Sequence, residues 1–221
     1  MLFKNLKTLV YSALICYSVL LHSCAIQPPE EKGDFKESDL VELVELDQSF
    51  KLDIRYASNN NFVGRPVYTE ARAFLQRPAA LQLIKVNKEL NELGYGLIIF
   101  DGYRPWSVTK TFWDVTSKEN KKFVGNPKYG SRHNRGCAID VSLFNLRTGE
   151  AVPMTGEYDE WSERSYPYYT GGTEQQREMR DLLREKMEAN GFKVYEFEWW
   201  HFDFQGWEEY RIQNIPFSEI N

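Results

Sequence analysis

The sequence predicts an α+β domain in which a mainly antiparallel sheet is flanked by helices. Segments with the two-residue period of strands are mixed with segments of helical period, without the regular β-α-β alternation that builds parallel sheets. The 221 residues contain 42% hydrophobic side chains, which suffices for one sizeable domain plus an appendage. No internal repeat or low-complexity tract interrupts the pattern.

Strands open the predicted domain. From Leu40 to Ile54, apolar side chains alternate with polar ones, as in half-buried strands. After a turn-rich segment, 57–66, Pro78 is typical of the first turn of a helix, which Gly94 ends. The apolar face expected for this helix comprises Leu83, Val86, Leu90 and Leu93.

The middle of the chain predicts two strands with a helix between them. Gly96 to Phe100 is a short apolar strand, and a helix is expected over 107–117. In the next strand, 137–144, Asp140 faces away from the large apolar residues and lies between two small ones, which leaves room for a ligand. The side chains that the helix would bury are Val108, Phe112 and Val115.

The most regular helix is predicted over Thr173–Asn190. Thr173 and Gln176 form a capping box at its first turn, and Gly191 ends it. The aromatic-rich segment that follows, Phe192–Phe204, is typical of strands. The buried stripe of the helix comprises Met179, Leu182, Leu183 and Met187.

Residues 1–24 have the layout of an export signal. Two lysines precede an almost uncharged apolar run, Leu9–Leu21, which is too short to span a bilayer comfortably. The sequence Leu-His-Ser-Cys at 21–24 resembles a bacterial lipobox. The resemblance implies an exported lipoprotein, which is anchored to a periplasm-facing membrane by lipid attached to Cys24. A membrane anchor that is not removed is the alternative interpretation.

The rest of the chain divides into a flexible tether, 25–38, and a domain, 39–221. The tether combines prolines, a glycine and charges without an apolar pattern of its own. Removing residues 1–24 removes two lysines and no acids, so 25 basic residues remain against 32 acidic ones, a net charge of about −7. This balance, with no stripe of lysine and arginine, argues against nucleic acid as a partner.

Histidine is scarce, and its placement indicates a metal site. After loss of His22 with the signal, only His133 and His201 remain, each in a stretch that also carries acids. Two imidazoles and one carboxylate, that of Asp140, leave a fourth position open, as in catalytic zinc sites. Nitrogen ligands favour zinc over calcium and magnesium. The alternative is a polar loop histidine and a hydrogen-bonded histidine in an aromatic strand.

Glu198 is the candidate base for a zinc-bound water. The aromatic residues around it form an apolar setting, which raises the pKa of a carboxylate and suits it to proton transfer. The alternative is a solvated strand carboxylate. Glu198 and His201 are three residues apart and would face opposite sides of a regular strand, so we expect a bulge or turn between them.

Together these residues resemble the paired metal motifs of the M15 zinc peptidases, and within them the VanX-type D-alanyl-D-alanine dipeptidases. The resemblance covers most of the chain after about Leu40 and implies the Hedgehog/D,D-peptidase-like α+β fold. The motifs that carry it are Ser131-x-His133-x-x-Gly136-x-Ala138-x-Asp140, Glu198-x-Trp200-His201, Asp101-Gly102-Tyr103-Arg104-Pro105, Asn61-Phe62-x-Gly64, and the segment 153–159.

Carried over by position, the resemblance implies the role of each site residue. Glu198 would act as general base and then as proton donor to the leaving amine, and Arg104 would stabilise the oxyanion. Asp159 would receive the ammonium group of the substrate. One zinc ion would be bound by His133, Asp140 and His201. The substrate site would also include Ser131 and Tyr56.

The implied activity is zinc-dependent hydrolysis of the D-Ala-D-Ala dipeptide to two D-alanines, which makes 39–221 the catalytic domain. One alternative is a zinc D,D-carboxypeptidase or endopeptidase on longer peptidoglycan peptides, which Asp159 would exclude. Another is a non-catalytic metal-binding lipoprotein, which would need neither Glu198 nor Arg104. The alternative interpretation of Arg104 is a loop arginine that pairs with Asp101, and that of Asp159 is an acid in a surface turn. Arg132 departs from the family pattern where an end of the substrate is expected to bind.

Overall fold

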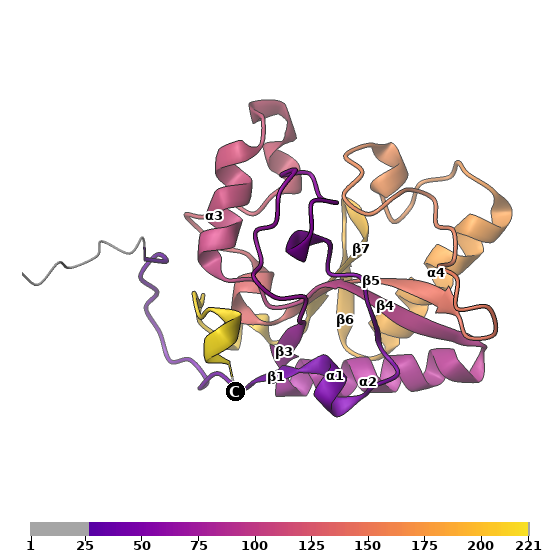
Figure 1. Cartoon of the computed structure of the whole chain (residues 1–221), viewed down its shortest axis with the longest axis horizontal. Coiled ribbons are helices and arrows are strands. Elements are labelled where there is room, and N and C mark those ends of the chain that lie inside the picture. Colours follow the sequence, from indigo (N-terminus) through magenta and orange to yellow (C-terminus); the bar gives the residue numbers. More distant parts are fainter. Residues whose placement is uncertain (1–26, 221) are drawn as a thin grey trace, which may run out of the picture.

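A five-stranded sheet forms the centre of the molecule (Figure 1). The computed structural model describes residues 27–220, so the predicted export signal and Cys24 lie outside it. The strand order is β2 (Lys51–Leu52), β4 (Tyr95–Asp101), β5 (Ala138–Asn145), β7 (Glu198–Phe204) and β6 (Phe192–Tyr195). Only the β2–β4 pair of this sheet is parallel. The predicted α+β class with a mainly antiparallel sheet is confirmed.

Helices cover both sides of the sheet. Helices α2 (Arg77–Glu92) and α4 (Glu174–Ala189) lie on one side, and α3 (Trp106–Val115) with the long loops lies on the other (Figure 1). Strands β1 (Leu40–Glu42) and β3 (Phe74–Gln76) form a small antiparallel pair of their own. The short helical turns are α1 (Leu43–Leu46), η1 (Arg55–Ala57), η2 (Lys118–Phe123), η3 (Arg132–Arg135), η4 (Glu163–Ser165), η5 (Trp207–Glu209) and η6 (Phe217–Glu219).

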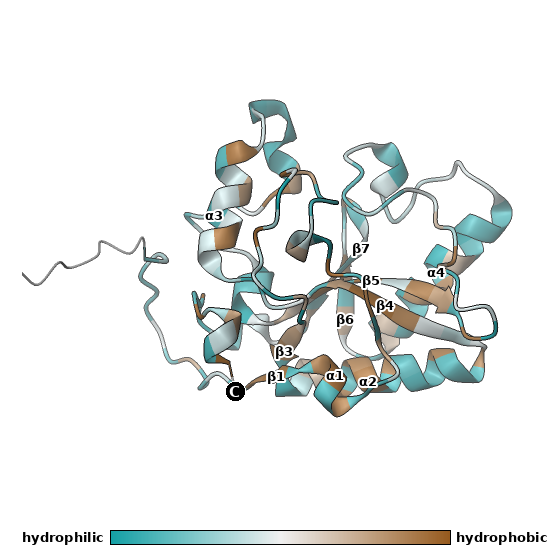
Figure 2. Ribbon diagram, viewed as in Figure 1, coloured by the Kyte–Doolittle hydropathy of each residue, from teal (hydrophilic) through white to brown (hydrophobic). Residues whose placement is uncertain are grey.

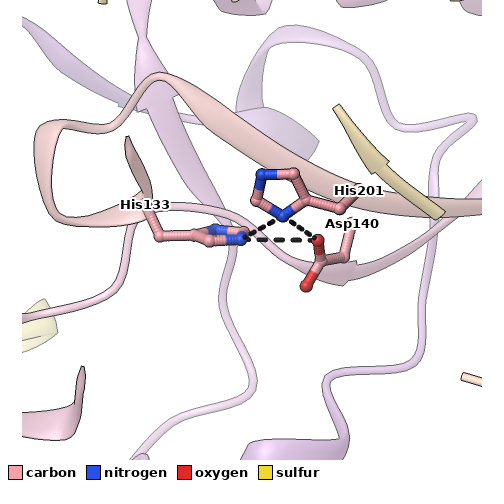
Figure 3. A group of neighbouring side chains, drawn as sticks. All are labelled: His133, Asp140 and His201. Atoms are coloured by element: carbon pink, nitrogen blue, oxygen red, sulfur yellow. Dashed lines mark hydrogen bonds and ion pairs between the residues drawn. The ribbon is translucent and has the colours of Figure 1, made fainter. Parts of the chain in front are cut away.

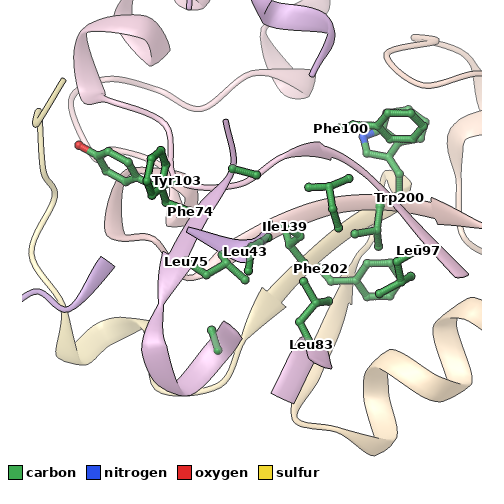
Figure 4. Packing of buried hydrophobic residues seen from close by; sticks show 14 of the residues in the cluster. Leu43, Phe74, Leu75, Leu83, Leu97, Phe100, Tyr103, Ile139, Trp200 and Phe202 are labelled. Carbon is green, nitrogen blue, oxygen red and sulfur yellow. The ribbon is translucent and has the colours of Figure 1, made fainter. Parts of the chain in front are cut away.

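The long helices follow the predicted patterns. Pro78 lies in the first turn of α2, and the capping box of Thr173 and Gln176 opens α4. Both helices turn an apolar stripe toward the sheet and a polar face outward (Figure 2). Helix α2 packs on β4, and α4 packs on β5, β6 and β7. Leu83 of α2 lies in the core with Leu97, Ile139 and Phe202 of the sheet (Figure 4), and the largest fully buried side chain is that of Trp200.

Two local predictions were wrong. Between Leu40 and Ile54, the helical turn α1 interrupts the expected strands, and Leu43 from this turn is fully buried. Val115 and Leu93 are 51% exposed although both were expected in apolar faces. Val115 is the last residue of α3 and Leu93 is the C-cap residue after α2, where the chain leaves the surface of the core.

Strand β7 contains the predicted bulge. Its register with β6 changes from the pair Val194–Phe202 to the pair Tyr195–Glu198. One step along β6 therefore corresponds to four steps along β7, and the extra residues remove the strict alternation of side chains. The predicted irregularity between Glu198 and His201 is confirmed.

The described part of the predicted tether, 27–38, contains no helix or strand and lies along the C-terminal segment. The Lys36 N–H donates to the Glu209 carbonyl at 2.8 Å, and Arg211 Nη1 donates to the Glu31 carbonyl at 2.9 Å. Among the helices of residues 27–220, none is long and apolar enough to cross a membrane.

Candidate active site

Three side chains from the two predicted motifs converge on one point (Figure 3). His201 Nδ1 lies 3.0 Å from His133 Nε2 and 3.0 Å from Asp140 Oδ1, and His133 Nε2 lies 3.4 Å from the same oxygen. Strands β5 and β7 bring Asp140 and His201 together, because these two residues pair directly across the sheet. The structure thus groups all three predicted ligands into one candidate metal centre.

Local sequence explains how His133 reaches this centre. Ser131 and Asn134 form a capping box around η3, in which Ser131 Oγ accepts from the His133 N–H. Gly136 ends the turn with φ +70°, and a Cβ there would lie 2.4 Å from Leu40 Cδ2. Cap and glycine therefore fix the turn that carries the first imidazole.

Hydrogen bonds behind the two imidazoles fix their tautomers. His133 Nδ1 lies 2.7 Å from the Gly102 carbonyl oxygen, which can only accept, so this nitrogen carries the proton. His201 Nε2 lies 2.9 Å from Asp203 Oδ1 and donates to it. The opposite nitrogen of each ring is left with its lone pair directed into the centre.

This arrangement fits a bound cation. Two nitrogen lone pairs and a carboxylate oxygen within 3.4 Å of one another repel unless a proton or a metal ion lies between them. Burial alone would raise the pKa of the Asp140 carboxyl, but His133 and His201 hold that pKa well below its usual range. The Tyr158 hydroxyl donates to the second oxygen of Asp140 at 3.0 Å and fixes the carboxylate.

Glu198 lies beside the centre without joining the ligand set. Its Oε2 is 3.9 Å from His201 Nδ1, and the residue is buried. Burial raises the pKa of the Glu198 carboxyl to about 8, against the lowering effect of His201. A carboxyl group with this environment can accept and return a proton near neutral pH.

Arg104 lies on the wall of the same cavity. Its Nε and Nη2 donate to Asp101 Oδ2 at 2.8 and 2.6 Å, so the expected ion pair is present and fixes the guanidinium plane. Asp101 is in turn held by the Tyr68 hydroxyl at 2.7 Å. Within residues 27–220, Arg104 Nη1 has no hydrogen-bond partner, which leaves it free for a ligand.

Asp159 and Tyr56 close another part of the cavity. The Tyr56 hydroxyl lies 3.0 and 3.1 Å from the two carboxylate oxygens of Asp159. Burial and the charge of Asp140 raise the pKa of the Asp159 carboxyl to about 7. Among residues 27–220, Asp159 is the only non-glycine residue with positive φ, at 60°. A strained, partly buried acid in a cavity is typical of ligand-binding positions.

The cavity brings all the predicted site residues of the domain together. Its volume is about 110 Å³, and Ser131 lies on its wall with the groups described above. Sequence reasoning missed three groups that orient the ligands: the Gly102 carbonyl, Tyr158 and Asp203. Only Asp203 carried a usable signal, because it lies two residues after His201 and so faces the same side of β7.

Comparison with known proteins agrees with this geometry. The M15 peptidase family model, described as D-ala-D-ala dipeptidase, matches residues 36–219. The D-alanyl-D-alanine dipeptidase of Enterococcus faecalis is 34% identical over 184 residues, which cover 75% of this chain and 91% of that protein. The protein of the same name from Escherichia coli is 32% identical, over 82% of this chain and 94% of that protein. The one from Streptomyces coelicolor is 30% identical, over 77% of this chain and 91% of that protein. The chain therefore belongs to the M15 peptidase family, and it is a metallopeptidase with the α+β fold expected of that family.

Proposed function

We propose that this metallopeptidase is a zinc-dependent D-alanyl-D-alanine dipeptidase. The observation that carries the substrate assignment is the pair Asp159–Tyr56, which places a carboxylate in the cavity that also holds the metal ligands and Glu198. A carboxylate in that place fits the free ammonium group of a dipeptide. The names of the relatives support the same substrate.

The donor set supports zinc as the metal. Two imidazole nitrogens and one carboxylate with an open fourth position are the usual ligands of catalytic zinc, whereas calcium and magnesium prefer all-oxygen shells. Bound zinc lowers the pKa of a coordinated water toward neutrality and polarises a carbonyl group.

The residues around the metal centre transfer the proton, stabilise the oxyanion and bind the substrate. Glu198 takes up the proton of the attacking water and passes it to the leaving amine, which its raised pKa favours. Arg104 is held rigidly by Asp101, so its guanidinium can stabilise negative charge on the carbonyl oxygen without reorganising. Asp159 binds the ammonium end, and Ser131 contributes to the substrate wall of the cavity.

One set of measurements tests this function. The purified chain is expected to retain about one zinc ion and to release D-alanine from free D-Ala-D-Ala much faster than from a stem pentapeptide. Glu198→Ala should retain zinc and lose activity by a factor on the order of hundreds or more. Unchanged activity of this variant would contradict the mechanism. Faster release from the pentapeptide would instead indicate the carboxypeptidase alternative.

We also propose that the enzyme is an exported lipoprotein anchored through Cys24. The basic start, the short apolar run and the lipobox-like sequence 21–24 support this localisation. The anchored enzyme would meet peptides released from the cell wall.

A further inference from the structure

Two arginines lie behind the turn that carries His133. Arg132 and Arg135 are the first and last residues of η3, and their guanidinium carbons lie 4.7 and 5.3 Å from the centroid of the Trp207 ring. Side chains three residues apart project from the same side of a 3₁₀ helix. Both arginines therefore share one aromatic ring, while His133 between them points to the metal centre.

Two cations on one ring require compensating charge, and a carboxylate lies within 4.0 Å of each arginine. Arg132 Nε lies 3.5 Å from Asp203 Oδ2, and Arg135 Nη2 lies 2.5 Å from Glu31 Oε1. Asp203 also accepts the hydrogen bond from His201 that fixes the tautomer of this ligand. Glu31 is the one acid within 4.0 Å of Arg135 in the described part of the chain.

Two further hydrogen bonds hold Glu31 in place. Its second carboxylate oxygen accepts from the Ile212 N–H at 2.7 Å, and its backbone carbonyl accepts from Arg211 Nη1 at 2.9 Å. Its partner Arg135 is 8% exposed and also donates Nη1 to the Tyr210 carbonyl. This part of the predicted tether is therefore docked on the domain and reaches Arg135 in the turn that carries His133.

We propose that Glu31 is a positioning residue for the metal centre. It neutralises Arg135, the last residue of the turn that carries His133. Without Glu31, the buried guanidinium of Arg135 loses its carboxylate, and this uncompensated positive charge behind the site disfavours a second cation at the metal centre. The inference rests on the proposed metal site, and it gives the segment before the catalytic domain a role in metal binding.

Zinc affinity tests the role of Glu31. The full chain, purified in detergent, competes with a chelator for zinc, as wild type and as two single variants. Glu31→Gln is expected to raise the zinc dissociation constant about tenfold, the order expected when a buried cation near a metal site loses its counter-charge. Glu30→Gln removes the same charge from the neighbouring exposed residue and should leave the constant unchanged.

A second variant separates positioning from simple docking of the segment. Glu31→Gln combined with Arg135→Met removes the uncompensated cation as well, so zinc affinity should return to within about threefold of wild type. This variant also carries the test if Glu31→Gln alone does not fold. Wild-type affinity in Glu31→Gln, or no recovery in the double variant, would overturn the inference. A wild-type chain that binds no zinc would contradict the proposed function, and this inference with it.

Discussion

Asp203 shows how one side chain outside the ligand set can control a metal site. It accepts a hydrogen bond from His201 Nε2 at 2.9 Å and thereby directs the other nitrogen of the ring to the centre. Asp203→Ala removes this acceptor, so zinc affinity should fall roughly 10- to 100-fold, as for other outer partners of metal-bound histidines. Chelator competition measures the change. Asp203→Asn keeps an acceptor oxygen and should lose less; equal losses in both variants would contradict this role.

Asp159 combines backbone strain with an unfavourable charge. Its pKa of about 7 lies above its ordinary value of 3.8, so the folded state binds the proton more tightly than the unfolded state. Stability therefore falls as the pH rises from about 4 through 7. Asn tolerates the same positive φ without the charge. At pH 8 the free energy of unfolding of Asp159→Asn should exceed that of wild type by on the order of 2 kcal/mol, a figure that allows for the partial exposure of residue 159. At pH 4 the two proteins should be nearly equally stable. Thermal unfolding of both proteins at pH 4 and pH 8 measures this difference in stability. A difference that does not grow between pH 4 and pH 8 would contradict the assignment of the raised pKa to Asp159.

The same substitution should weaken substrate binding. The ammonium group of the dipeptide loses its carboxylate partner in Asp159→Asn, and a hydrogen bond to a charged group contributes roughly 1.5–3 kcal/mol. KM for free D-Ala-D-Ala should therefore rise at least about tenfold with a smaller change in kcat. In wild type, KM should rise as the pH falls below about 7, where Asp159 becomes protonated. A pH-dependent KM that persists in the variant would assign the titration to another group.

At the scale of elements, prediction succeeded where the signal was local. Helix α4 has its capping box and stripe within one continuous segment, so nothing distant is needed to define it. The bulge in β7 followed from chemistry, because Glu198 and His201 had to reach one site from a spacing of three. Helix α1 could not be found in this way. Its single turn exists because distant residues bury Leu43, and a turn of four residues has no periodicity to detect.

The capping box of α4 can be tested separately from catalysis. Thr173 Oγ1 accepts from the Gln176 N–H at 3.2 Å, and Gln176 Oε1 accepts from the Thr173 N–H at 2.8 Å. Thr173→Ala should destabilise the protein by about 1 kcal/mol, which lowers Tm by a few degrees for a chain of this size. Thr173→Ser retains the hydroxyl and should restore most of the loss. kcat/KM should not change, and a parallel loss of activity would link this helix to the site.

For the whole molecule, the site depends on pairings that a single sequence does not encode locally. Asp140 meets His201 because β5 lies beside β7 in a register that places them opposite each other. Histidine scarcity pointed to two residues that the structure brings together, His133 and His201, since only these two imidazoles lie outside the predicted signal. The docking of Glu31 on Arg135 had no such signal, because a charged segment rich in proline resembles a tether whether or not it finds a partner.

Docking of residues 31–36 also limits how far the enzyme can stand from its proposed anchor. Six residues lie between Cys24 and Glu31, so the seven Cα-to-Cα steps span at most about 25 Å when fully extended. If Cys24 carries the lipid, the domain is held close to the membrane surface. The wild-type protein should therefore sediment with membranes and require detergent for release, whereas Cys24→Ser should lose the lipid and, if the signal is still processed, become soluble. Mass spectrometry of the N-terminal peptide checks the modification directly. A wild-type chain that is soluble and unmodified at Cys24 would exclude the anchor, and the zinc chemistry of the domain would be unaffected.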